Sequence, residues 1–252
     1  MASNRMLYFI RSSGDDRGAL KKALSWLLEM GDRGYLALPS FRGLDGPISE
    51  ELGKAAVYEL KSKGAATIMG KQITMITKTT NIIDAKGAPL VAIYPYGHFL
   101  DSLDSIHNVS SILVLPWSMQ EIDTWTKAWG AKELGGKRVK AGIDEPANKA
   151  AIEAMKDICG NVNPSSGVEK PVDRDAFVQA FAMLKDAGEV FIPGDLKIWL
   201  IANQGWRATQ AEEVAEIAAE VLLGRMVAQG NPVWPDGQVE AWRKRASSAS
   251  QA

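Results

Sequence analysis

Four short apolar runs in the first half of the chain each end abruptly in a cluster of small or polar residues. The runs are Leu7–Ile10, Tyr35–Leu38, Leu90–Ile93 and Ile112–Leu115. Runs that are short and apolar at consecutive positions are typical of strands buried on both faces, as in a parallel sheet covered by helices. Open sheets of this kind bind ligands in the crevice beyond the carboxyl ends of their strands. We therefore expect a functional site in the polar clusters.

The segments between these runs show helical and hairpin patterns. Apolar residues recur at three- and four-residue spacing over 19–28 and again over 52–60, which predicts two helices that pack against the sheet. Residues 66–69 and 73–77 flank Gly70-Lys71, a pattern typical of a β-hairpin. We expect this hairpin to be an antiparallel addition at one edge of the sheet.

Further helices are predicted before the middle of the chain and just beyond it. Apolar positions predict a short helix over 99–106, and Ser118 with Glu121 forms a capping box that starts another. Residues 146–158 form a further helical stretch.

A linker divides the predicted domains. Residues 161–171 are rich in Asn, Pro, Ser and Gly, which is typical of a linker. Residues 1–160 are predicted to form an α/β domain with a mainly parallel, doubly wound (Rossmann-like) sheet and an antiparallel edge hairpin. Residues 172–245 are predicted to form a small C-terminal three-helix domain, and residues 246–252 a disordered tail.

Composition and charge narrow the function classes only slightly. The net charge of −1 gives no global attraction to nucleic acid or to anionic membranes. The single cysteine, Cys159, excludes an internal disulfide and any cysteine-rich zinc site. No apolar run approaches the ~20 residues that a membrane helix needs, and the apolar stretch before Arg11 is too short for a signal peptide. We expect a cytoplasmic protein without a membrane partner.

The first two polar clusters each combine a cation with a flexible backbone. Arg11, Ser12 and Ser13 precede a predicted helix, whose N-terminal N–H groups attract anions, and Arg42 follows the second run. If these two strands are neighbours in the sheet, Arg11 and Arg42 converge on one carboxylate or phosphate. Two aspartates at the helix start oppose an anion, so helix capping and solvated arginines are the alternative interpretation.

The other two clusters carry aromatic side chains and a histidine. Tyr94, Tyr96 and His98 follow the third run, where a histidine beside a tyrosine can act as an acid or base near neutral pH. Trp117 and Ser118 follow the fourth run, where an aromatic ring can stack on a base or a sugar. A surface histidine and a packed tryptophan are the alternatives. The spacing of the two histidines matches no metal motif, and the sequence identifies no metal ligand or cofactor.

Two further segments bear on nucleic-acid binding. Residues 132–140 place lysines and an arginine among glycines, which suits either a solvated loop or a contact with nucleic acid or an acidic partner. The predicted helices over 196–203 and from Thr209 follow the order of a helix-turn-helix. Four glutamates on the second of these helices oppose a phosphate surface, so a docking bundle is the better interpretation.

The signatures of P-loop enzymes, nicotinamide-binding dehydrogenases and α/β-hydrolases are not met in full. We expect a cytoplasmic binding or interaction protein, and regulation is one role that such a protein can have. Its strand-end rim is expected to bind a small anionic ligand or a protein partner. One alternative is an enzyme acting on a nucleotide-like or phosphorylated small molecule, with Arg11 and Arg42 as an anion clamp and His98 as acid or base. The other is a weak nucleic-acid-binding protein. The rim site requires that the four strands end on the same side of the sheet.

Overall fold

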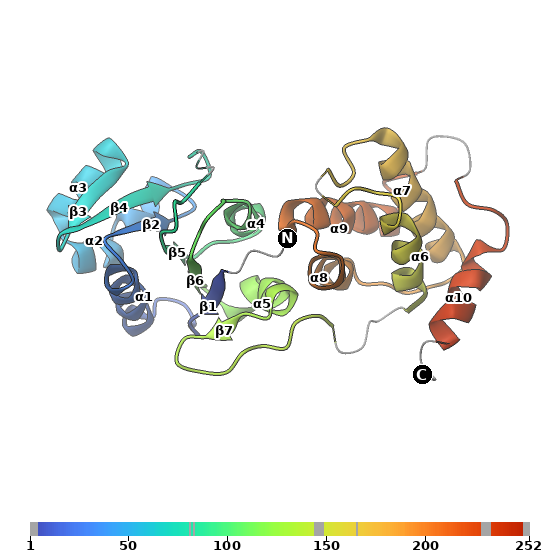
Figure 1. The fold of residues 1–252 in the computed structure, drawn as a ribbon, viewed down its shortest axis with the longest axis horizontal. Helices are drawn as coiled ribbons and strands as arrows, with labels where there is room; N and C mark the ends of the chain where they lie inside the picture. The colour runs from blue at the N-terminus through green and yellow to red at the C-terminus, as the bar shows by residue number, and fades with distance from the viewer. Residues whose placement is uncertain are drawn as a thin grey trace. The chain divides into compact units, whose positions relative to one another are not determined.

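The chain divides into two compact units, Met1–Lys140 and Ala141–Ala252. The computed structural model describes residues 5–80, 82, 84–143, 149–164, 166–227 and 233–248. Within these residues the first unit holds a β-sheet with helices, and the second unit is helical (Figure 1).

A seven-stranded sheet, ordered β3-β4-β2-β5-β6-β1-β7, forms the centre of the first unit. Its strands are β1 (Met6–Phe9), β2 (Arg33–Ala37), β3 (Ala65–Ile68), β4 (Lys71–Ile76), β5 (Leu90–Ile93), β6 (Ser111–Leu115) and β7 (Lys132–Glu133). All neighbouring pairs in this sheet are parallel except β3 with β4. The four apolar runs are therefore parallel strands, and the predicted fold class is confirmed.

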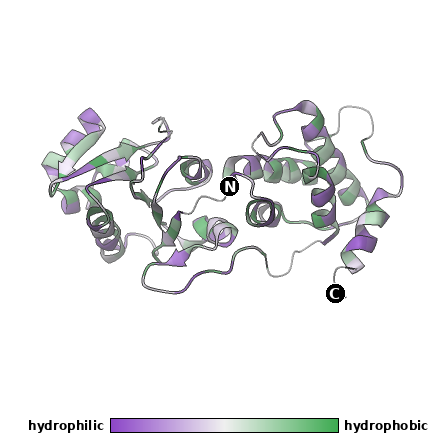
Figure 2. Cartoon of the chain, in the orientation of Figure 1, coloured by the Kyte–Doolittle hydropathy of each residue, from purple (hydrophilic) through white to green (hydrophobic). Residues whose placement is uncertain are grey.

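The central strands are buried because both faces of the sheet are covered. β5 and β6 are buried at every position and pair in register from Leu90 with Ile112 to Ile93 with Leu115. Figure 2 shows hydrophobic residues in these strands and mixed faces on the surrounding helices. Continuous apolar character at these positions thus reflects the two-sided burial typical of a parallel sheet.

The hairpin of β3 and β4 closes one edge of the sheet. Its turn lies at Met69 and Gly70, with φ of 48° and 78°, one residue before the predicted position. Two successive positive φ angles fit the tight turn that matches the twist of a hairpin. β3 is the antiparallel edge strand that was expected, but β4 also pairs in parallel with β2, so the hairpin is half inside the parallel sheet.

Helices cover the two faces of the sheet in separate layers (Figure 1). The helices are α1 (Arg17–Glu29), α2 (Pro47–Leu52), α3 (Lys54–Lys63), α4 (His98–Asp104) and α5 (Asp123–Trp129), with single turns η1 (Phe41–Leu44) and η2 (Met119–Ile122). Along β5, Val91 and Ile93 join the core under α1, α2 and α3, whereas Leu90 and Ala92 join the core under α4 and α5. This alternation along one strand shows that the sheet is doubly wound.

The connections leave the sheet in opposite directions at two places. β1 leads to α1 on one face, while its neighbour β6 leads through η2 to α5 on the other face. In the same way β2 leads to α2 and its neighbour β5 leads to α4. A crevice opens at the carboxyl edge where adjacent strands send their connections to opposite faces, and ligands of open α/β sheets bind there.

Helices α6 to α10 make up the second unit within the described residues. They are α6 (Lys149–Cys159), α7 (Pro171–Asp186), α8 (Pro193–Gln204), α9 (Ala208–Leu222) and α10 (Gln238–Ser248). The three predicted helices correspond to α7, α8 and α9. No described helix is long and apolar enough to cross a membrane.

The structure divides the chain earlier than the composition of residues 161–171 indicates. That segment joins α6 to α7 inside the second unit, and α6 packs against α7 and α10 there. The division falls instead between Lys140 and Ala141. At the C-terminus α10 continues to Ser248, so residues 246–248 of the expected tail are helical, and residues 249–252 lie outside the described residues.

Candidate functional site

The parallel strands of the sheet all end at the same edge, as the rim site requires. The clusters after β1, β2, β5 and β6 therefore share this carboxyl edge with the segment that follows β4. Their order along the edge follows the strand order β4-β2-β5-β6-β1-β7. This spatial order, and not the order of the strands along the chain, determines which clusters are neighbours.

Arg11 and Arg42 do not converge, because β1 and β2 are not neighbours. β5 and β6 lie between them, so about 14 Å of sheet separates the two strands at ~4.8 Å per spacing. Arg11 Nε donates to Glu133 Oε2 on the neighbouring β7 at 3.0 Å. Arg42 is exposed in η1 and forms no ion pair with a described residue. The condition on which the anion clamp was expected, that the two strands are neighbours, is therefore not met.

Three strand-end loops meet at Gly14, Tyr94 and Trp117. Gly14 N donates to the Trp117 carbonyl at 2.8 Å, which ties the loop after β1 to the loop after β6. Tyr94 N donates to the Leu115 carbonyl at 2.7 Å, and the rings of Tyr94 and Trp117 lie edge to face with centroids 5.3 Å apart. We call Ser12, Tyr94 and Trp117, one from each loop, the rim cluster. Ser12 and Trp117 are predicted ligand contacts, whereas Tyr94 belongs to the predicted third cluster without a ligand role of its own.

The rim cluster contains two buried hydroxyls without a partner. Ser12 is only 8 % exposed, and neither its Oγ nor the Tyr94 Oη forms a hydrogen bond with any described residue. A buried polar group left unsatisfied costs about 1–3 kcal/mol. Such groups in a native protein call for an explanation, and one explanation is a ligand that pairs with them.

The backbone of Tyr94 is held in an unfavourable conformation. Its φ of 50° lies in the left-handed region, which bulky side chains rarely adopt. Conformations of this kind cost about 1–3 kcal/mol and cluster at ligand sites, because the surrounding structure must enforce them. Tyr94 stands directly after an apolar run and before Pro95, which is the only sequence signal for this residue.

Acidic groups surround this end of the edge. Burial and then the charges of Asp15 and Asp16 raise the pKa of Tyr94. Asp16 also caps α1 by accepting a hydrogen bond from Ala19 N at 2.9 Å, which confirms the capping interpretation. Arg17, which follows Asp16 directly in the sequence, forms an ion pair with Glu50. The potential beside Tyr94 therefore favours a neutral or cationic ligand group over an anion.

Tyr96 belongs to a different part of the edge. Lys78 Nζ, in the segment after β4, donates to Tyr96 Oη at 3.0 Å and lies 4.1 Å from the ring centroid. The ring is half exposed. Because β4 and β5 flank β2, this contact passes over the end of β2. No contact among the described residues joins Tyr96 to the rim cluster, so the two lie in separate parts of the edge.

The remaining predicted residues have simple local placements. His98 is the exposed first residue of α4, and Ser13 is an exposed loop residue. The backbone N–H of Ser118 donates to Glu121 Oε2 at 3.3 Å, as the predicted capping box requires. His98, Ser13 and Ser118 stay predictions as ligand contacts.

The other candidate segments have structural roles in the described residues. Lys132 lies in β7, and Arg138 donates to the Gly130 carbonyl at 3.1 Å, so part of the basic segment supports the fold. Burial raises the pKa of Cys159 to about 12, which makes its thiol a poor nucleophile at neutral pH.

Residues 147–243 match the family model of a domain of unknown function, DUF1889. The match begins just before α6 and ends within α10, so it lies inside the second unit. No curated protein and no solved structure matches the chain. The second unit is thus similar to the DUF1889 family, and the unit that carries the rim cluster lies outside the match.

Proposed function

We propose that the first unit is a binding module, regulatory in character, that takes a small ligand at the rim cluster. One observation carries this proposal: two buried hydroxyls, those of Ser12 and Tyr94, lack partners among the described residues at the ends of β1 and β5, on either side of β6, whose connection diverges from that of β1. A ligand that pairs with both groups removes their desolvation cost. The partly buried single cysteine fits a reducing compartment, and we place the protein in the cytoplasm.

The ligand that fits this chemistry has a flat ring and neutral polar groups, as a nucleoside does. Trp117 is 49 % exposed, so part of its side chain is open to a ligand, and its ring lies edge to face with that of Tyr94. Stacking of a base on an aromatic side chain contributes ~1–3 kcal/mol. The hydroxyl and amino groups of such a ligand can donate hydrogen bonds to Asp15. A phosphate would instead be repelled by this carboxylate, because the site is acidic.

Binding of nucleosides to the full chain tests the proposal. We expect adenosine, guanosine, cytidine or uridine to raise the melting temperature and to give a saturable signal in titration calorimetry. Trp117→Ala should weaken that binding by about tenfold or more, because the stacking surface is lost. The matched control is Tyr58→Ala, which removes an aromatic side chain that is 72 % exposed on α3 and should bind normally.

Two outcomes contradict the proposal. Absence of a thermal shift with all four nucleosides would remove the ligand class, and equal affinity in Trp117→Ala would remove the site. Release of free base or another product during the titration would support the alternative of an enzyme on the same class of ligand.

A further inference from the structure

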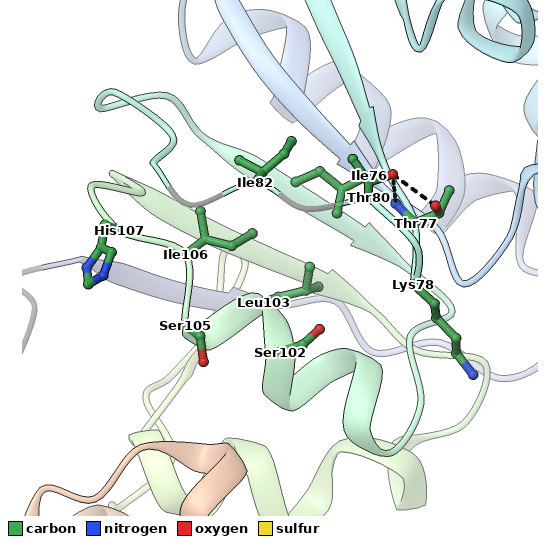
Figure 3. Close-up of a pocket in the computed structure, with 10 residues that line it drawn as sticks. All are labelled: Ile76, Thr77, Lys78, Thr80, Ile82, Ser102, Leu103, Ser105, Ile106 and His107. Carbon is green, nitrogen blue, oxygen red and sulfur yellow. Dashed lines mark hydrogen bonds between the residues drawn. The ribbon is translucent and has the colours of Figure 1, made fainter. Parts of the chain in front are cut away.

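A second cavity lies beside the carboxyl end of β4, and Figure 3 shows its lining. It has a volume of about 310 Å³ and runs between the segment after β4 and the last turn of α4. Four apolar side chains line it, namely Ile76, Ile82, Leu103 and Ile106. We call this cavity the β4 groove. It contains no residue of the rim cluster.

The groove follows from the way the chain crosses from β4 to β5. Helices usually cover both faces of a doubly wound sheet. Here the crossover passes β2 without any helix in the described residues between 77 and 89. On the face of the sheet that Ile76 joins, α4 is therefore the described helix that borders the end of β4. Ile76 and Leu103 are almost fully buried beside the open space.

Hydrogen-bond donors are in excess at one end of the groove. Thr77 Oγ1 lies 3.1 Å from Thr79 Oγ1 and 2.9 Å from Thr80 Oγ1. Three hydroxyl protons thus serve two hydrogen bonds, and one proton is left for another acceptor. Thr77 and Thr80 line the groove, and Thr79 lies next to them in the chain. The Lys78 ammonium has three protons, of which one is donated to Tyr96.

The charge of the lining has one sign. Among the described residues no lining side chain is acidic, and Lys78 forms no ion pair with any of them. Lys78 and Thr77 lie at one end in Figure 3, and His107 lies at the other. A cation with spare hydroxyl donors is suited to an anion, whose charge-assisted hydrogen bonds are the strong ones. The apolar lining suits a hydrocarbon body next to that anion.

We propose that the β4 groove binds a small organic anion, with its charged head at Lys78 and the threonines and its apolar body along Ile76, Leu103 and Ile106. Carboxylate and phosphate heads share this chemistry. A volume near 310 Å³ is at the lower end for ligand pockets, so the body is short. The inference stands on the groove alone and does not require a ligand at the rim cluster.

Titration calorimetry of the full chain with three six-carbon probes tests the proposal. Hexanoate and hexyl phosphate carry the charged head, whereas hexanol has the same body without charge. We expect at least one anion to bind saturably and hexanol to bind at least about tenfold more weakly, as loss of a charge-assisted hydrogen bond predicts. The stronger of the two anions identifies the head group. Failure of both anions to bind overturns the proposal.

Two lysine variants locate the bound anion. Lys78→Ala should weaken binding of the preferred anion by about tenfold or more, because the ion pair and its hydrogen bond are lost. Lys21→Ala is the matched control, since Lys21 is exposed on α1 and away from the groove, and it should bind like the parent protein. Unchanged affinity in Lys78→Ala, or hexanol binding as tightly as the anions, would show that the groove does not recognise an anion.

Discussion

Tyr94 combines an unfavourable φ, a buried hydroxyl without a partner and an edge-to-face contact with Trp117. In the ligand-free protein the hydroxyl contributes no hydrogen bond, so its loss removes only a desolvation cost. Tyr94→Phe should therefore leave the free energy of unfolding unchanged or raise it by up to about 1 kcal/mol, while nucleoside affinity falls severalfold. Urea denaturation and titration calorimetry measure the two effects.

Ser12→Ala follows the same logic and serves as the companion variant. Its hydroxyl is also buried and unpaired, so we again expect no loss of stability together with weaker binding. A clear loss of stability in both variants would show that these hydroxyls are paired within the folded protein. Their role as ligand contacts would then have no support.

Asp104 is a buried carboxylate with three donors. Arg5 Nη2 lies 2.7 Å from its Oδ1, and the indole N–H groups of Trp125 and Trp129 donate to its Oδ2. Burial raises the pKa of Asp104 to about 6, against the lowering effect of Arg5. This network lies apart from the strand-end clusters, since Arg5 precedes β1, and we assign it to the stability of the first unit.

The raised pKa of Asp104 predicts a pH dependence of stability. The folded protein holds this proton more tightly than the unfolded chain, so the contribution is present at low pH and is lost as pH rises through about 6. Asp104→Asn should destabilise the protein by about 1–3 kcal/mol at low pH, where the parent carboxyl is protonated, because the amide that replaces it turns an NH2 donor toward Arg5 or toward the two indole N–H groups. That destabilisation should shrink between pH 4 and pH 7, as urea denaturation of both proteins would measure. A difference that grows with pH would contradict the raised pKa.

At the scale of elements, local sequence determines the strands that are apolar along their whole length. β5 and β6 were predictable because burial on both faces demands continuous apolar runs. β7 was not, because it has two residues, Lys132 and Glu133, and its pairing with β1 depends on a distant segment. The same limit applies to the arginines, since the insertion of β5 and β6 between β1 and β2 is a long-range choice that no local pattern records.

The rim cluster was predictable in part for a related reason. Ser12 and Trp117 follow apolar runs, so a strand-end argument finds them. Tyr94 also follows such a run, yet what marks it is a positive φ and an unpaired hydroxyl, and both depend on the neighbouring loops. The β4 groove likewise arises only when the segment after β4 folds against the end of α4.

Two carboxylates of α6 pair with α10, since Arg245 donates to Glu153 and to Asp157, and Asp157 also holds two other side chains of α10. Asp157 Oδ2 accepts from Trp242 Nε1 at 2.8 Å and from Gln238 Nε2 at 3.1 Å, and Trp242 is fully buried. Asp157→Ala should cost about 2 kcal/mol, since it leaves a buried indole N–H unpaired. Hydrogen exchange should rise first in α10. Asp186→Ala, at an exposed position of α7, is the control and should leave that exchange unchanged.

At the scale of the whole molecule, two boundaries make different predictions for fragments. α6 buries Ala151, Ala154 and Met155 completely, and it packs against α7, α8 and α10. A fragment 1–160 would therefore expose the apolar face of α6 to water, whereas a fragment 1–140 would not.

We expect fragment 1–140 to be monomeric with a cooperative thermal transition, and fragment 1–160 to aggregate. Fragment 141–252, which contains the DUF1889 match, should show a cooperative helical transition by circular dichroism. A monomeric, equally stable 1–160 together with an unfolded 141–252 would place the boundary in residues 161–171, where the composition of the chain first indicates it.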